Sequence, residues 1–356
     1  MTSLREIALL FLKLGTIGFG GPAAHIALME SEIVKRRRWL SHQEFLDLLG
    51  ATNLIPGPNS TEMAIHIGYR RAGFPGLVVA GACFILPAAL IVTWIAWLYV
   101  HYGTLPQLQL VLRSVKPVMI VVVLQALRSL ARTAMKTSVL VAVAVGSVAL
   151  SLAGVHELLV LLIAAIGCAI ASRLRRSASM LLSMELLPLF LFFMKVGSVL
   201  FGSGYVLLAF LRADLVERWH WLTAGQLLDA VAVGQITPGP VFTTATFIGY
   251  ILAGIPGASV ATIGIFLPAF VFVALSGSLV PRIRQSNLAA AALDGVNAGS
   301  LALMAVVTMQ LASTAVVDIP TSLIAVAAAI AIFVFKMNSV WLVGGAALAG
   351  ILASAI

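Results

Sequence analysis

The chain has very few charged residues. Asp, Glu, Lys and Arg together make up only 10% of its 356 residues, whereas apolar residues make up 61%. Soluble domains carry about 25% charged and about 45–50% apolar residues, so this composition excludes an ordinary soluble protein. Apolar runs of about 18 residues or more recur along the chain, and each can cross a bilayer as a helix. The sequence therefore predicts an all-α, polytopic membrane protein.

Cysteines and catalytic motifs are equally scarce. The two cysteines, Cys83 and Cys168, lie in apolar runs and fit no metal-ligand spacing. The sequence has no Walker A, HExxH, GxSxG or haem motif, so we expect no enzyme, no metal and no cofactor. Ser60 with His66 is the only weak nucleophile–base pair. Lys13 interrupts the first apolar run, which argues against a cleaved signal peptide.

The net charge of +9 comes from Lys and Arg in short loops. These basic residues are not interleaved with exposed aromatics, so nucleic acid is not an expected partner. Basic loops of a membrane protein stay on the cytoplasmic side. We therefore expect the loops to orient the chain in the lipid bilayer.

The two halves of the chain repeat one another. Lys13 aligns with Lys195 at an offset of 182 residues, and the Pro-Gly-Pro of residues 56–58 aligns with that of residues 238–240. Beyond these motifs the offset becomes 181. A register held over this length indicates a duplication, with repeats at 1–176 and 177–356. The expected apolar segments are 4–29, 45–67, 76–100, 108–131, 137–153, 156–172, 186–211, 227–250, 257–280, 287–313, 319–335 and 338–355.

Loop charges predict how the repeats are oriented. Residues 35–38 and residues 70–71 are both basic, so the segment between them is expected to enter and return on the cytoplasmic side. The matching loops of the second repeat, 212–218 and 252–257, are balanced or neutral. The sequence therefore favours an inverted-topology tandem repeat with broken or re-entrant helices, an arrangement found in transporters. Parallel copies with six full crossings each are the alternative, and they would leave a basic loop outside.

Each Pro-Gly-Pro is expected to end one helix and start another, because proline lacks an N–H and clashes with the preceding turn. The first amides of the new half-helix lack partners and suit an anion. A packing kink is the alternative, since proline is common in membrane helices. The expected anion-binding residues are Lys13, Gly20, Gly21, Asn53, Pro56, Gly57, Pro58, Asn59, Ser60 and Thr61 in the first repeat, and Lys195, Gly202, Gln235, Pro238, Gly239, Pro240, Thr243 and Thr244 in the second.

Several charged or titratable residues fall within the apolar runs. A charge at membrane depth is costly, so Lys13 and Lys195 are functional candidates, with snorkelling to the interface as the alternative. Arg113 and Asp294 occupy equivalent places and either pair across the pseudo-twofold axis or lie at segment edges in water. The candidates for proton coupling are Glu62, His66, His25 and Asp294. For His66 the alternative is a buried histidine bonded to a backbone carbonyl.

These motifs resemble the chromate ion transporter (CHR) family. The resemblance rests on both Pro-Gly-Pro motifs and on the sequences FGGP at 19–22, GYRRAG at 68–73, FILPA at 84–88 and DGVNA at 294–298. It covers nearly the whole chain as two family domains in tandem.

The resemblance implies a multi-pass carrier of the bacterial inner (plasma) membrane. The carrier would export chromate, or a similar tetrahedral dianion such as sulfate, and would be driven by the proton gradient. Alternating access would rock one repeat against the other. An anion channel is the alternative, and a homodimer is left open as the assembly.

Overall fold

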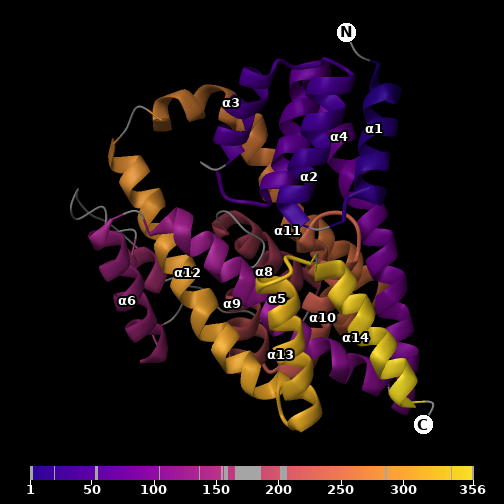
Figure 1. Cartoon of the computed structure of the whole chain (residues 1–356). Coiled ribbons are helices and arrows are strands. Elements are labelled where there is room, and N and C mark those ends of the chain that lie inside the picture. Colours follow the sequence, from indigo (N-terminus) through magenta and orange to yellow (C-terminus); the bar gives the residue numbers. More distant parts are fainter. Residues whose placement is uncertain are drawn as a thin grey trace. The chain divides into compact units, whose positions relative to one another are not determined.

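In the computed structural model, helices joined by short turns make up the part of the chain that is described (Figure 1). No strand occurs among these residues, which confirms the all-α class. The described residues are 3–19, 21–52, 55–103, 105–135, 137–153, 155, 159–164, 186–200, 207–284, 287–337 and 339–354.

Many of the described helices are long and apolar enough to lie in a bilayer. Shorter apolar helices accompany four that have the length and composition of membrane spans. The predicted polytopic membrane protein is thereby confirmed. The four spans lie within Asn59–Tyr102, Gln109–Arg128, Val241–Ser276 and Asp294–Ala315, and the shorter helices within Leu140–Leu152, Leu186–Val199, Ile319–Phe333 and Trp341–Leu352.

From α1 to α6 the described helices of the first repeat recur in the same order in the second, from α8 to α13, which agrees with the tandem repeat. Even a seven-residue π-helix recurs, as η1 and η2 at an offset of 182. The first repeat contains α1 (Leu4–Ile17), α2 (Gly21–Met29), η1 (Glu30–Arg36), α3 (His42–Thr52), α4 (Asn59–Tyr102), α5 (Pro106–Ala134) and α6 (Ser138–Leu152). The second contains α8 (Leu186–Val199), α9 (Leu207–Leu211), η2 (Arg212–Arg218), α10 (Ala224–Ile236), η3 (Val241–Thr243), α11 (Thr244–Arg284), α12 (Asn287–Ala315), α13 (Ile319–Phe333) and α14 (Ser339–Ser354).

The helices α4 and α11 each reverse direction at a glycine. Gly73 has φ 61° and ψ −148°, and Gly254 has φ 60° and ψ −149°. Only glycine adopts this region without strain, which explains why both repeats have it here. Beyond the first reversal the chain folds back, so that Gly76 packs directly on Gly68. Each long helix is therefore a short half-helix followed by a longer, returning one.

The half-helix of residues 59–71 ends beside the place where the helix α3 begins. Arg70 Nη2 lies 3.3 Å from Glu44 Oε1, and Arg71 Nη1 donates to the carbonyl of Trp39 at 3.1 Å. After passing through Pro-Gly-Pro, the chain thus returns to the place where it entered. This is the path predicted for a re-entrant segment.

The chain divides into two compact units, and each unit draws on both repeats. Unit 1 consists of Met1–His101, Ser183–Gly204 and Val233–Pro281, and it contains both Pro-Gly-Pro motifs. Unit 2 consists of Tyr102–Leu182, Tyr205–Ala232 and Arg282–Ile356. The predicted junction of the two repeats, at residue 176, lies outside the described residues.

The core of unit 1 joins the two repeats. One cluster brings Ile55, Ile65 and Leu77 of the first repeat against Ala269 and Val273 of the second. All five side chains are at least nine-tenths buried. Within a bilayer such contacts stabilise through close packing, so this cluster supports the contact between the repeats within this unit.

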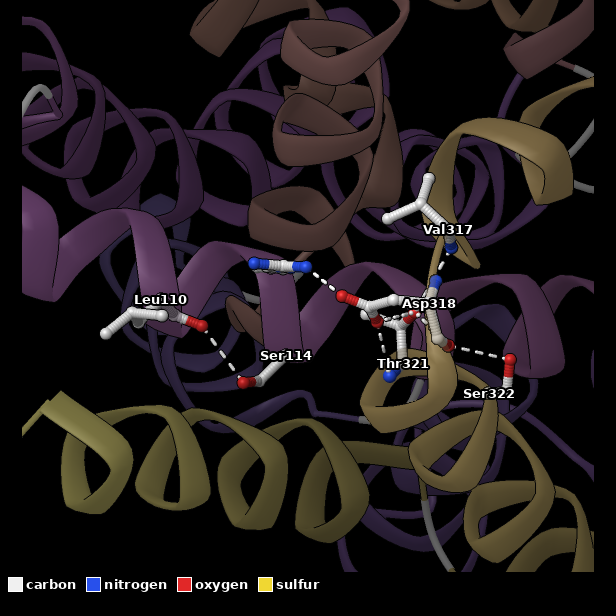
Figure 2. Close-up of polar contacts among 7 residues, drawn as sticks. Leu110, Ser114, Val317, Asp318, Thr321 and Ser322 are labelled. Carbon is white, nitrogen blue, oxygen red and sulfur yellow. Dashed lines mark hydrogen bonds and ion pairs between the residues drawn. The ribbon is translucent and has the colours of Figure 1, made fainter. Parts of the chain in front are cut away.

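Unit 2 is organised around α5, which packs against α12, α13 and α14 (Figure 1). Arg113 on α5 pairs with Asp318. Asp318 also caps α13, where it accepts from the N–H of Thr321 at 2.9 Å (Figure 2). The partner of Arg113 is therefore Asp318 rather than Asp294, because Asp318 stands at the exposed start of a helix that packs on α5. Asp294 is half-buried in α12.

Candidate functional site

The first Pro-Gly-Pro separates two helices, as the sequence predicts. The helix α3 ends at Thr52 and α4 begins at Asn59. The amides of Thr61 and Glu62 already bond to the carbonyl of Pro58, at 2.8 and 3.0 Å. The amide of Ser60 comes before these first bonded amides of the half-helix, and so it is a donor that the half-helix can offer to a ligand.

Two reciprocal hydrogen bonds connect the Pro-Gly-Pro turn of each repeat to the residue that follows the first helix of the other repeat. The N–H of Gly57 donates to the carbonyl of Leu200 at 2.6 Å, and the N–H of Gly239 donates to the carbonyl of Gly18 at 2.9 Å. Gly239 follows Gly57 by 182 residues, and Leu200 follows Gly18 by the same offset. A reciprocal contact of this kind is typical of a two-fold relation. It also engages both glycine amides, which are therefore not free to bind an anion.

Side-chain packing reinforces the same junction. A Cβ added to Gly57 would lie 3.5 Å from the Cβ of Ala269, and one added to Gly239 would lie 2.6 Å from the Cβ of Ala88. Ala88 and Ala269 are equivalent residues of the two repeats. Each Pro-Gly-Pro turn thus fits against the returning helix of the other repeat, and at Gly239 only a glycine fits.

His25 links Gly18, the residue that follows α1, to the half-helix of α4. Its Nε2 lies 2.8 Å from the carbonyl of Gly18, to which it must donate, and its Nδ1 lies 3.2 Å from Ser60 Oγ. A neutral ring accepts from Ser60, whereas a charged ring donates to it. His25 is 1% exposed, and its ring is perpendicular to that of Phe84, with the ring centres 5.4 Å apart.

Three further polar side chains on α4 are buried without a hydrogen-bond partner among the described residues. They are the Thr61 hydroxyl, both carboxyl oxygens of Glu62, and Nε2 of His66. Thr61 and Glu62 have no exposed surface, and His66 is 6% exposed. Buried polar groups are nearly always hydrogen-bonded, so such a cluster indicates a place where a ligand, water or proton belongs.

The second repeat does not reproduce this cluster. The Thr243 hydroxyl donates to the carbonyl of Pro240 at 2.8 Å, and the Thr244 hydroxyl donates to that of Val241 at 2.9 Å. Leu207 stands at the place of His25, and Phe247 at the place of His66. The polar site of unit 1 is therefore built by the first repeat, while the second repeat supplies the Leu200 carbonyl and apolar walls.

The two lysines lie in different surroundings. Lys13 Nζ donates to Glu32 Oε1 at 2.7 Å, and the lysine side chain is 46% exposed. This hydrogen bond is the main reason why the pKa of Glu32 is lower than that of an ordinary glutamate. Lys195 is half-buried, and its ammonium group lies 5.8 Å from the centre of the Phe192 ring.

The remaining predicted residues fall into three groups. Pro56, Pro58, Pro238 and Pro240 form the turns described above, and all but the half-buried Pro56 are buried. Gln235 is 8% exposed near the end of α10, and Gly21, at φ 77°, begins α2. Gly20, Asn53 and Gly202 lie outside the described residues.

Sequence reasoning missed the carbonyl groups of Gly18 and Leu200. A backbone acceptor has no residue type that would mark it, so the repeat register was the only available signal. Within the part of the chain that the structure describes, no group of three His, Cys, Asp or Glu side chains could hold a metal ion.

Comparison with known proteins gives consistent matches. The family model described as chromate transporter matches residues 5–170 and again residues 187–351. A chromate transport protein of Cupriavidus metallidurans is 32% identical, over 99% of this chain and 93% of that protein. One of Pseudomonas aeruginosa is 31% identical, over 96% and 90%, and a probable chromate transport protein of Synechococcus elongatus is 30% identical, over 92% and 89%. No solved structure matches the chain.

Proposed function

Because the chain belongs to the chromate transporter family, we propose that it carries chromate, or a similar tetrahedral oxyanion such as sulfate, across the membrane. The observation that supports this most is the polar site at the start of α4, inside an otherwise apolar unit. Its donors are the amide of Ser60 and the hydroxyl of Thr61. A half-helix start with such donors suits a divalent oxyanion.

The proposal includes export, coupling to protons and location in the bacterial inner membrane. Our proton-coupling candidates are Glu62 and His66 on α4 and His25 on α2; unpartnered buried atoms of the first two and the contact of His25 with Ser60 support this choice. Lys13 and Lys195 remain candidates for drawing the anion towards the site by charge. The matched relatives are named as transport proteins, and we propose no enzymatic step.

Alternating access is proposed in a form that keeps the two breaks together. Rocking one whole repeat against the other would break the hydrogen bonds from Gly57 to Leu200 and from Gly239 to Gly18, and it would open the shared apolar cluster. We therefore replace it with movement of unit 1 as a body that contains parts of both repeats.

Flux of chromate into proteoliposomes tests the proposal, with Thr61→Val as the probe. The change removes one buried donor and keeps the side-chain shape. A hydrogen bond to a charged group contributes about 1.5–3 kcal/mol, so we expect oxyanion affinity to fall by about tenfold or more. Thr243→Val is the matched control, because its hydroxyl already bonds to Pro240, and its half-saturation concentration should stay at the wild-type value.

The same vesicles separate a carrier from a channel. A carrier gives saturable flux that responds to an imposed proton gradient, whereas a channel gives single-channel conductance. Equal loss of affinity in the Thr61 and Thr243 variants would contradict the assignment of the site to the first repeat. If the vesicles showed no oxyanion-dependent flux in either direction, the proposed function would be overturned.

A further inference from the structure

The Glu62 carboxyl group is buried in a way that requires a ligand or a proton. Its side chain has no exposed surface, and neither carboxyl oxygen has a hydrogen-bond partner among the described residues. An ionised carboxylate in such a place is costly unless it is paired. The ion pairs found in the described parts of unit 1 do not include Glu62.

The carboxyl group also lies beside the half-helix start at which we propose that the oxyanion binds. Glu62 lies in the first turn of α4, and its Oε1 folds back against Gly57 in the Pro-Gly-Pro turn. The unpartnered hydroxyl of Thr61 is next to it in the chain. An anion held by the amide of Ser60 and the hydroxyl of Thr61 would therefore lie close to this carboxyl group.

The elements that pack against this turn bring few other titratable groups. The helix α4 itself carries His66, and α2 carries His25, which is engaged by Gly18 and Ser60. On α1, Lys13 pairs with Glu32, and on α8, Lys195 lies over Phe192. The helix α11, whose Ala269 faces Gly57, has no charged residue between Thr244 and Pro281.

We infer that oxyanion binding at the start of α4 takes up a proton on the carboxyl group of Glu62. This inference rests on the proposed function. A protonated Glu62 donates its O–H to an oxyanion, whereas the ionised form repels it. By linkage, a proton that strengthens oxyanion binding is itself held more tightly once the oxyanion is bound.

The second repeat explains why one proton site per chain is expected. Its half-helix has Thr243 and Thr244 in the corresponding turn, and their hydroxyl groups bond to backbone carbonyls. No carboxyl group stands there. The coupling group is thus a feature of the first repeat alone, although the helix breaks are common to both.

The test measures oxyanion affinity and proton uptake together, on the purified full-length chain in detergent. Sulfate is the first probe, because it remains a dianion across the range, and chromate is titrated in parallel. For the wild type we expect affinity to fall by about tenfold per pH unit on the alkaline side of the transition. Binding in weak buffer should take up as much as one proton per oxyanion.

Glu62→Gln should remove both effects. The amide keeps an N–H donor in place of the protonated carboxyl group, so we expect the variant to bind at every pH with the affinity of the wild type at acidic pH. Glu44→Gln is the control, because this carboxyl group is exposed at the entry of α3 and bonds to Arg70. It should keep the wild-type pH profile.

Two results would overturn the inference. One is oxyanion binding by the wild type without proton uptake, which needs no variant and holds even if Glu62→Gln fails to fold. The other is a Glu62→Gln variant with the pH profile of the wild type. Absence of oxyanion binding by the wild type at any pH would instead refute the proposed function on which the inference rests.

Discussion

Replacing Gly239 with alanine should be far more damaging than the same change at Gly254. Both glycines belong to the second repeat and both have positive φ, 89° at Gly239 and 60° at Gly254. An alanine in such a conformation costs about 1–3 kcal/mol at either position. The two sites differ in their surroundings, because a Cβ at Gly254 meets nothing within 4 Å.

At Gly239 the added methyl group would lie 2.6 Å from the Cβ of Ala88 and 3.3 Å from the carbonyl oxygen of Gly15. Overpacking of this kind costs about 1–3 kcal/mol. It would also push the turn away from the carbonyl of Gly18, to which the amide of Gly239 donates. We therefore expect the free energy of unfolding of Gly239→Ala to be lower than that of Gly254→Ala by about 1–3 kcal/mol.

Thermal unfolding in detergent, followed by tryptophan fluorescence at one scan rate, measures the difference. At about 2 °C per kcal/mol, Gly239→Ala should melt about 2–6 °C below Gly254→Ala. Gly239→Ala should also lose oxyanion flux, whereas Gly254→Ala should retain it in proportion to the folded protein. Equal melting temperatures in the two variants would refute the close contact between the repeats at this turn.

Two further predictions concern charge and motion. The hydrogen bond from Lys13 lowers the pKa of Glu32. The stability that this bond contributes is therefore present above the ordinary carboxyl pKa and is lost as pH falls through the lowered pKa of Glu32. Thermal stability of the wild type should therefore decline at acidic pH more steeply than that of Glu32→Gln, and parallel profiles would contradict the pairing. Spin labels at Phe74 and Ile255, equivalent exposed positions in unit 1, should keep one separation when oxyanion is added. Labels at Ile255 and Trp341, which belong to the same repeat but to different units, should change theirs, and the reverse pattern would favour rocking of whole repeats.

Much of the fold could be predicted because the duplication makes local signals recur. Pro-Gly-Pro at 56–58 and 238–240 marks the helix breaks, since proline cannot continue a helix. The reversals at Gly73 and Gly254 fall between predicted apolar segments, and the two glycines occupy equivalent positions in the repeats. Composition alone then places the helices in a bilayer.

The candidate site was predicted only in part. Glu62 and His66 could be named because titratable residues are rare in apolar runs, and their lack of counterparts in the second repeat was visible in the sequence. The bonds from Gly57 to Leu200 and from Gly239 to Gly18 could not be predicted, because backbone groups carry no residue-specific signal. The partner of Lys13 was hidden by the π-helix η1, which changes the face on which Glu32 lies.

The stoichiometry of oxyanion binding tests the central claim most directly. The breaks are present twice, but the polar site is built once, by Ser60, Thr61 and Glu62 of the first repeat. Isothermal titration of the purified chain with chromate should therefore give one oxyanion per chain, with the affinity weakened by Thr61→Val and unchanged by Thr243→Val. Two equivalent oxyanions per chain, or one that responds to Thr243 and not to Thr61, would contradict the account.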